Sequence, residues 1–191
     1  MKVCICGGTN PATNPKWLPA AAELGKLLCK YDFEMVWGGN AFGVLSSIHQ
    51  QYIDNRKANT LFLPKAYEDD LLIMSTDKVE MTHLVVERTH AMFLATNVVV
   101  IVPGGIGTIY EFWTAVEGLR AGEYDIDIIL LNYKDFYKHQ LEHFKFINDH
   151  GFTKIGQGGA PYKIEPTDLF TIVETPEQVI AELKRIQKLR R

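Results

Sequence analysis

One run of residues limits the possible folds of this chain more than any other feature. Residues Val98 to Val102 (VVVIV) are all apolar and β-branched, and the run stops abruptly at Pro103. A strand with no polar side is typical of the centre of a parallel sheet whose two faces are both covered. The run therefore predicts a sheet with helices on each side rather than an exposed antiparallel sheet.

Short apolar runs alternate with longer segments of helical period along the rest of the chain. This alternation predicts an α/β fold: a single-domain, Rossmann-like, doubly wound parallel sheet over residues 1–191, with helices on both faces. The expected strands are 2–6, 33–37, 60–63, 79–84, 98–102, 126–131 and an edge strand at 169–173. The first expected helix begins near residue 15. The others cover 44–52, 86–95, a segment from Thr108 to Gly122, 136–150 and 176–190, the last with Thr175 as N-cap. Residues 65–77 are interpreted as a surface loop, either a lid over a site or a plain connection.

Length and composition narrow the functional classes. The chain has 191 residues, of which 47% are hydrophobic and 23% charged, and it is long enough for one sizeable core. A net charge of −3 predicts no broad basic surface for nucleic acid. No apolar run reaches the roughly 18 residues of a membrane span, and no apolar leader is visible, so we expect a cytoplasmic protein without membrane contact. Cys4, Cys6 and Cys29 are odd in number and are interpreted as reduced core residues.

Three glycine turns follow the expected strands, at the edge where doubly wound sheets bind their ligands. In the sharpest of them, residues 104–108 (GGIGT), three glycines in four residues let backbone amides approach an anion, and a threonine hydroxyl follows as a helix begins. The other two turns contain Gly7-Gly8-Thr9 and Gly38-Gly39-Asn40. We therefore expect a phosphate site, with Gly8, Thr9, Gly39, Gly104, Gly105, Gly107 and Thr108 as candidate binding residues.

Other nucleotide and metal chemistries fit the sequence less well. The first turn lacks GxGxxG spacing and no carboxylate follows the second strand, which disfavours a nicotinamide or flavin role, and no GxxxxGK[ST] segment supports triphosphate hydrolysis. Residues 139–143 (HQLEH) match an HxxEH zinc pattern, but a zinc site needs a further carboxylate ligand, so these histidines are interpreted as surface residues. Lys78 and Lys134 lack the partners of a pyridoxal-binding lysine. We expect neither a metal nor a cofactor.

Three charged residues are expected near the same crevice. Glu111 follows Gly107 by four residues, which places its carboxylate one helical turn from the expected phosphate. Glu87 and Arg88 lie near the start of the preceding helix. Arginine offers a fixed fork of donors and glutamate offers a negative charge or a base, a combination that suits a sugar phosphate. A purely structural ion-pair cluster is the alternative that the spacing leaves open.

Residues 103–111 (PGGIGTIYE) resemble the PGGxGTxxE motif of the lonely guy (LOG) family, nucleoside 5′-monophosphate phosphoribohydrolases that are often named lysine decarboxylases. Glu87-Arg88 is similar to the Glu-Arg of that family's second motif. The resemblance implies hydrolysis of the N-glycosidic bond of an AMP-like nucleoside 5′-monophosphate, giving free base and ribose 5-phosphate, in a homodimer with active sites near the interface. It also implies that Arg88 and Glu111 form the catalytic pair and that Gly104, Gly105, Gly107 and Thr108 cradle the phosphate.

Among the positions that differ from the family pattern, two flank the expected catalytic pair. Thr89 stands where the family usually has a lysine, and Tyr110 where it usually has a second glutamate. These differences leave open which base is released, and they leave a non-catalytic nucleotide-binding or sensing protein as the alternative. The roles within the pair are also open. Glu111 could stabilise positive charge on the sugar, hold ribose hydroxyls or position water, and Arg88 could anchor the base or the phosphate or stabilise the departing base.

Overall fold

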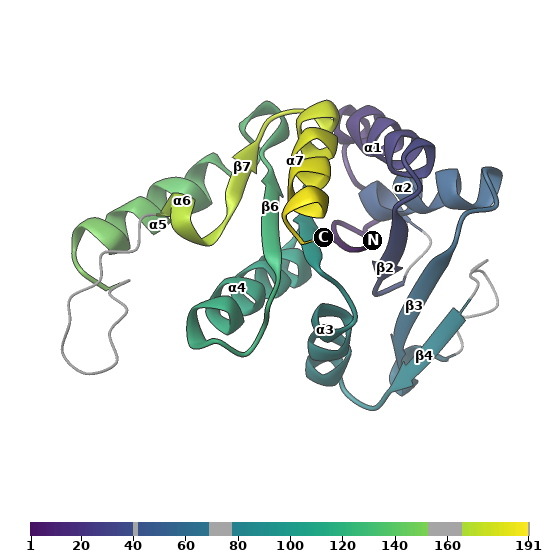
Figure 1. The fold of residues 1–191 in the computed structure, drawn as a ribbon, viewed down its shortest axis with the longest axis horizontal. Coiled ribbons are helices and arrows are strands. Elements are labelled where there is room, and N and C mark those ends of the chain that lie inside the picture. Colours follow the sequence, from purple (N-terminus) through teal and green to yellow (C-terminus); the bar gives the residue numbers. More distant parts are fainter. Residues whose placement is uncertain (40–41, 69–77, 153–165, 191) are drawn as a thin grey trace.

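The fold is described here from a computed structural model, over residues 1–39, 42–68, 78–152 and 166–190. This part of the chain forms a seven-stranded, wholly parallel sheet in the order β4-β3-β2-β1-β5-β6-β7 (Figure 1). The strands are β1 (Lys2–Cys6), β2 (Glu34–Trp37), β3 (Asn59–Pro64), β4 (Lys78–Thr82), β5 (Val98–Ile101), β6 (Asp127–Leu131) and β7 (Thr171–Val173). The helices are α1 (Leu18–Lys30), α2 (Gly43–Asp54), α3 (Val85–Leu94), α4 (Ile106–Ala121), α5 (Lys138–Asp149), α6 (Pro166–Leu169) and α7 (Pro176–Leu189), with short 3-10 turns at Pro15–Trp17 and Tyr133–Asp135.

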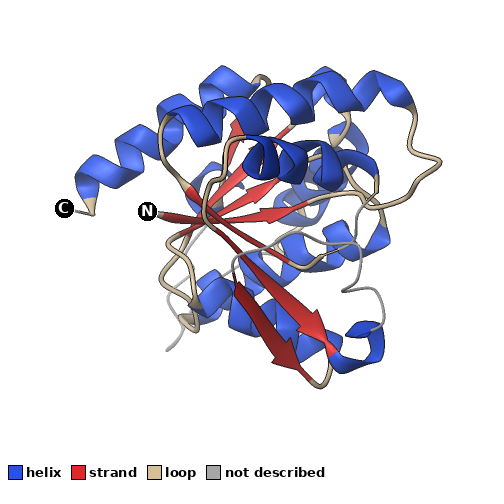
Figure 2. Ribbon diagram, turned by 90° about the vertical axis from the view of Figure 1, so that its right-hand side faces the viewer, coloured by secondary structure: helices blue, strands red, loops and turns tan. Residues whose placement is uncertain are grey.

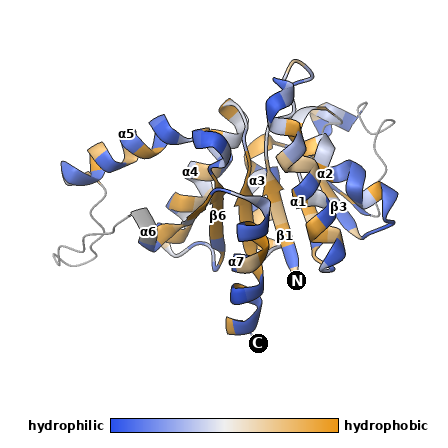
Figure 3. Cartoon of the chain, turned by 90° about the horizontal axis from the view of Figure 1, so that it is seen from above, coloured by the Kyte–Doolittle hydropathy of each residue, from blue (hydrophilic) through white to orange (hydrophobic). Residues whose placement is uncertain are grey.

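Both faces of the sheet are covered by helices, as the apolar run 98–102 predicts (Figure 2). Val98, Val100 and Val102 pack into one core cluster with residues of α1, α2 and α7. Val99 and Ile101 point the other way, into a second cluster with residues of α3, α4 and α5. All five side chains are fully buried, so each face contributes its own apolar core. Figure 3 shows the same division, with hydrophobic strands between helices whose outer sides are largely hydrophilic.

The connection order fixes where a ligand can bind. From β1 the chain builds the sheet outward through β2, β3 and β4, then returns to pair β5 with the other side of β1 and continues to β6 and β7. The direction of winding therefore reverses between β1 and β5. In open parallel sheets a crevice forms at this switch point, outside the carboxyl ends of the two strands.

Two expected helix ends have the geometry that their residues favour. Gly122 closes α4 in the left-handed conformation, with φ of 75°, where a glycine has no steric penalty. Thr175 caps α7, since its hydroxyl accepts from the backbone N–H of Gln178 at 3.3 Å and the Gln178 side chain accepts from the Thr175 N–H at 3.1 Å. The parallel sheet and the two layers of helices described above confirm the expected α/β class with helices on both faces.

Several boundaries differ from expectation. Leu169 does not begin the edge strand; it ends α6 and packs against the second core cluster, and β7 starts at Thr171. The strand expected at 79–84 stops at Thr82 because the next two backbone amides are bound by the Glu87 carboxylate at the start of α3. The helix expected from 136 begins at Lys138, after a 3-10 turn. Asn40, most of the loop expected at 65–77 and residues 156–161, whose sequence GQGGAP is rich in glycine, lie outside the described residues.

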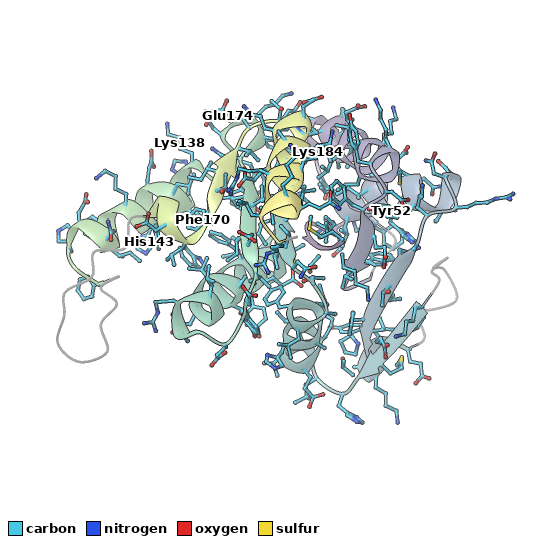
Figure 4. The ribbon with its side chains drawn as sticks, in the orientation of Figure 1. Tyr52, Lys138, His143, Phe170, Glu174 and Lys184 are labelled. Carbon is cyan, nitrogen blue, oxygen red and sulfur yellow. The ribbon has the colours of Figure 1, made fainter. Side chains whose placement is uncertain are left out.

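Other sequence expectations concern the surface and the cysteines. Cys4, Cys6 and Cys29 are buried and free, as expected of reduced core residues. No helix within the described ranges combines the length and the apolar character that crossing a bilayer requires. Figure 4 shows Lys138 and His143 on α5, which extends outward on the side of the molecule that carries β7.

Candidate functional site

A cavity of about 690 Å³ opens at the carboxyl ends of the strands, at the switch point between β1 and β5. Its walls come from the segments that follow six neighbouring strands, so it runs across the sheet from Val85 after β4 to Phe136 after β6. The three glycine turns singled out in the sequence all contribute to its lining. A concave site of this size is in the range that binds small-molecule ligands.

The first turn of α4 forms part of the cavity wall. Gly105 is the N-cap residue and no side chain caps the helix. The first helical backbone amide with a carbonyl partner is that of Ile109, which donates to the Gly105 carbonyl at 3.0 Å. The amides of Ile106, Gly107 and Thr108 therefore have no partner within the helix, and these residues line the cavity. Unsatisfied amides at the positive end of a helix bind phosphate oxygens.

Glycine is needed at two of the turns for close backbone packing. A Cβ at Gly104 would overlap the Thr108 hydroxyl and lie 2.7 Å from the Gly8 nitrogen. A Cβ at Gly8 would lie 3.2 Å from the Gly104 Cα, and the Gly8 N–H donates to the Pro103 carbonyl at 3.0 Å. The first and third turns are thus held against each other. Gly105 and Gly107 differ, because a Cβ at either would meet nothing within 4 Å, so their backbone is bare toward open space.

Arg88 and Glu111 form a direct ion pair inside the cavity. The Arg88 Nη2 lies 2.7 Å from the Glu111 Oε1, and the two side chains are only 16% and 9% exposed. Arg88 comes from α3 and Glu111 from the second turn of α4, so the pair joins two helices that lie on the same face of the sheet. The guanidinium lies against the Gly38 turn, where a Cβ would approach its Nη1 to 3.0 Å. The buried Arg88 Nε–H has no partner among the described residues, which leaves one donor unused.

The surroundings of Glu111 change the pKa of its carboxyl group. Burial raises the pKa of Glu111 above its ordinary value, and this effect outweighs the opposing influence of the Arg88 charge and of a hydrogen bond from the Cys6 thiol. A hydrogen bond with Cys4 and burial both raise the pKa of Cys6 itself, so this thiol stays protonated and acts as a donor. The cavity therefore contains a desolvated carboxylate, a fixed cation and the uncapped start of a helix close together.

The structure gathers nearly all of the residues expected at the site. Those that line the cavity are Gly8, Thr9, Gly39, Arg88, Gly104, Gly105, Gly107, Thr108 and Glu111. Glu87 does not line it: its carboxylate accepts from the N–H groups of His83 at 2.9 Å and Leu84 at 3.1 Å, and these bonds lower its pKa. Of the positions that differ from the family pattern, Thr89 is fully buried and donates to the Val85 carbonyl, whereas Tyr110 is 40% exposed.

Other lining residues are not apparent from sequence patterns. Cys6 lies beneath Glu111 at the end of β1, and nothing but its place at a strand end could have marked it. Five further lining residues come from irregular segments or short turns: Asn10, Asn14, Trp17, Tyr67 and Phe136. The HxxEH segment lies elsewhere, with His139 and Glu142 paired at 3.0 Å on the exposed side of α5. Within the described ranges, no three His, Cys, Asp or Glu side chains are grouped closely enough to hold a metal ion.

Comparison with known proteins supports the likeness suggested by the motif. A relative from Oryza sativa subsp. japonica, named a probable cytokinin riboside 5′-monophosphate phosphoribohydrolase, is 27% identical over 154 residues, covering 80% of this chain and 69% of its own. The cytokinin riboside 5′-monophosphate phosphoribohydrolase LOG1 of Arabidopsis thaliana is 23% identical over 176 residues, covering 92% and 78%.

Solved structures share the fold. The molybdenum cofactor carrier protein of Chlamydomonas reinhardtii matches with a TM-score of 0.70 at 19% identity, over 98% of both chains. A protein-family model described as possible lysine decarboxylase matches residues 37–183, which include the second and third glycine turns and the Arg88–Glu111 ion pair. The chain therefore belongs to the LOG family, to which this family model corresponds.

Proposed function

We propose that this protein hydrolyses the N-glycosidic bond of a nucleoside 5′-monophosphate. The observation that carries the proposal is the shared cavity of the Arg88–Glu111 ion pair and the uncapped first turn of α4. Glu111 lies four residues, about 6 Å along the helix axis, beyond Gly107. A phosphate bound at the amides would thus place the attached ribose beside the Glu111 carboxylate.

The proposed phosphate site would favour a monophosphate over a free nucleoside as substrate. The amides at Ile106, Gly107 and Thr108 and the Thr108 hydroxyl would donate to the phosphate oxygens. Gly8 and Gly104 hold the two turns in contact, which keeps these donors in a fixed arrangement. Fixed donors bind the phosphate without needing to reorganise, and the binding energy orients the sugar for reaction.

Glu111 would act on the sugar ring as the glycosidic bond breaks. The C1′–N bond cleaves, the base leaves with the bonding electrons, and positive charge develops at C1′ and the ring oxygen. Glu111 is the only carboxylate among the described residues that line the cavity, and its negative charge would stabilise this developing cation. Water then adds to C1′. One of its protons ends on the base, so the products are free base and ribose 5-phosphate.

Arg88 would position the carboxylate and contact the substrate. Its Nη2 holds one Glu111 oxygen at 2.7 Å, and the second oxygen remains for the sugar. Its unpartnered Nε–H is a donor for a substrate oxygen or for charge on the departing base. These two functions suit a residue that lies between the phosphate site and the far wall of the cavity.

A second copy of the chain would complete the site. Val86, His90 and Leu94 form an exposed stripe on α3, and the His90 ring nitrogen lies 2.9 Å from the Tyr124 hydroxyl, beside Tyr110 on α4. Val86 is 55% exposed, Leu94 61% and Ile106, at the cavity rim, 89%. Exposed apolar side chains grouped on neighbouring helices are typical of a surface that binds a protein partner. We propose a homodimer through this α3–α4 surface, defined by Val86, His90, Leu94, Ile106 and Tyr110.

Binding without cleavage is the second candidate function. Glu111 is the one carboxylate in the described lining, whereas glycosidases generally use two. This observation favours binding without cleavage. A site without a second group to protonate the leaving base could retain a nucleotide intact. The two candidates differ in a single measurable outcome, the release of free base.

The test uses the purified protein with AMP, GMP, CMP, UMP and N6-modified AMP, each beside its nucleoside. Chromatography detects free base and ribose 5-phosphate. We expect at least one monophosphate to be cleaved and its nucleoside to be left intact, since the nucleoside has no group for the α4 amides. Binding of a monophosphate without release of base would support the second candidate and contradict the proposal.

A further inference from the structure

The cavity extends beyond the proposed phosphate site to a pair of aromatic side chains. Trp17 and Phe136 both line it, and their rings meet edge to face with centroids 5.0 Å apart. Tyr133 supports Trp17 from outside the cavity, at 6.2 Å between centroids. We call Trp17 and Phe136 the aromatic corner. Neither residue has a part in the hydrolysis proposed above.

Strand order shows on which side of the phosphate this corner lies. Arg88 contacts the turn after β2, the phosphate amides follow β5, and Phe136 follows β6. Since the order across the sheet is β2-β1-β5-β6, the phosphate site lies between Arg88 and the aromatic corner. A nucleoside monophosphate with its ribose at the Arg88–Glu111 pair would therefore leave the corner empty.

Two lysines lie close to the aromatic corner, although neither is part of the cavity lining. The Lys16 Nζ lies 4.4 Å from the centre of the Trp17 ring, and the Lys134 Nζ lies 5.1 Å from the centre of the Tyr133 ring. Neither lysine forms an ion pair with a carboxylate in the described part of the chain. The Asp135 carboxylate, next to Lys134 in the chain, instead accepts from the Asn132 side-chain amide at 3.5 Å. Rings with cations beside them, next to a phosphate site, favour an anionic ligand that also carries a ring.

The backbone that presents Phe136 is unusual. Lys134 and Asp135 are consecutive and both left-handed, with φ of 51° and 56°. This conformation is unfavourable for residues with a side chain and is retained mainly where the surroundings require it, often at ligand sites. The following Tyr137 N–H donates to the Asn132 side chain at 2.8 Å, and its hydroxyl donates to the Val102 carbonyl at 2.6 Å. These bonds anchor the turn that holds Phe136 at the cavity wall.

We propose that the aromatic corner is a subsite for a ring joined to the nucleotide through a second phosphate. The ligand class is a nucleoside diphosphate bearing a sugar or base ring on its outer phosphate. The first phosphate binds the α4 amides, the second lies near Lys16, and the ring packs against Trp17 and Phe136. This inference rests on the proposed phosphate site but not on cleavage of the glycosidic bond.

The test compares the dissociation constants of AMP, ADP and ADP-ribose by calorimetry, with readings completed before turnover accumulates product. We expect ADP-ribose to bind about fivefold tighter than ADP, the size of one aromatic ring contact. Phe136→Leu should remove most of this preference and leave AMP binding unchanged. Phe146→Leu is the matched control, since Phe146 is 56% exposed on α5 and outside the cavity lining, and it should keep the preference.

Equal affinity of ADP and ADP-ribose for the wild-type protein would overturn the subsite, as would a Phe136→Leu variant that weakens AMP and ADP-ribose alike. Failure of the two proposals can be told apart. If AMP binds but is never cleaved, the hydrolase proposal fails and the subsite still stands on its binding data. If AMP does not bind at all, the phosphate site and both proposals are contradicted.

Discussion

At the scale of single residues, the central feature is a glutamate that is buried and paired rather than free. Sequence spacing brings Arg88 and Glu111 to one crevice, but it does not show that they bind each other, and the 2.7 Å bond required the packing of α3 beside α4. Glu87 is also a candidate site residue in the sequence, but it caps the start of its own helix, α3, instead. The difference is local: a carboxylate three residues into a helix competes for the helix's free amides.

The buried state of Glu111 predicts the pH dependence of activity. Burial raises its pKa above 4.5, the ordinary value for glutamic acid, and the proposed reaction needs the ionised form. We expect kcat/KM for AMP to fall as the pH drops, with a midpoint above that ordinary value. The folded chain also holds this proton more tightly than the unfolded chain, so the contribution of Glu111 to stability weakens as the pH rises between the two pKa values.

A pH–rate profile over the acid range measures this midpoint, and Cys6→Ala supplies a second reading. The Cys6 thiol lowers the pKa of Glu111, so its removal should move the acid limb to higher pH. A limb at or below the ordinary value in the wild-type protein, or one that is unaffected by Cys6→Ala, would show that Glu111 does not govern the rate.

At the scale of elements, the site depends on how two glycine turns meet the start of α4. Gly104 packs against the Thr108 hydroxyl and the Gly8 amide, whereas Gly107 has open space where a side chain would be. The sequence correctly predicts a glycine turn that leads into a helix here, and the anion site that such a turn favours stays a prediction. The sequence does not show that Gly104 is needed for close packing of the turns, whereas Gly107 leaves the backbone open to the cavity.

Gly104→Ala should separate these two uses of glycine. Its methyl group would force the turns apart, which we expect to cost about 1–3 kcal/mol of unfolding free energy and to abolish AMP binding. Gly107→Ala is the matched variant, because its methyl would meet nothing within 4 Å and should leave the melting temperature unchanged or raised. Thermal unfolding and AMP calorimetry measure both effects. A Gly104→Ala variant as stable as wild type would contradict the packing described here.

At the scale of the whole molecule, the proposed site lies beside the exposed α3–α4 surface. Ile106 belongs to both, since it follows the N-cap of α4 in the cavity wall and is 89% exposed. Side chains of this kind are rarely left in water in a contiguous group. Association of two chains through this surface would cover the cavity rim as well as the stripe on α3.

Charge placed on this surface should separate the two chains. We expect the wild-type protein to have about twice the 21.7 kDa mass of one chain by light scattering, and the double variant Val86→Glu/Leu94→Glu to have the mass of one chain. Phe146→Glu introduces the same charge at an exposed position on α5 and should stay dimeric. A monomeric wild-type protein, or a double variant that remains dimeric, would contradict this interface.

The extent of sequence-based prediction follows from the physics of each feature. The buried run 98–102, Gly122 and Thr175 are local signals, and each correctly predicts its element. Trp17, Tyr67 and Phe136 in the cavity wall come from 3-10 turns or their ends, which are distant in the chain, so no period or motif marks them as site residues. The strand at Thr171 is preceded by a short helix because Leu169 packs against the core, a tertiary contact that overrides the local pattern.

The release of ribose 5-phosphate from AMP, measured for the wild-type protein and for Glu111→Gln, tests the central claim most directly. The amide keeps the shape of the side chain and removes the charge that the proposed reaction requires. We predict that the wild-type protein releases adenine and ribose 5-phosphate in equal amounts, and that Glu111→Gln releases neither while still binding AMP. Equal rates for the two proteins, or a wild-type protein that binds AMP and leaves it intact, would contradict the account.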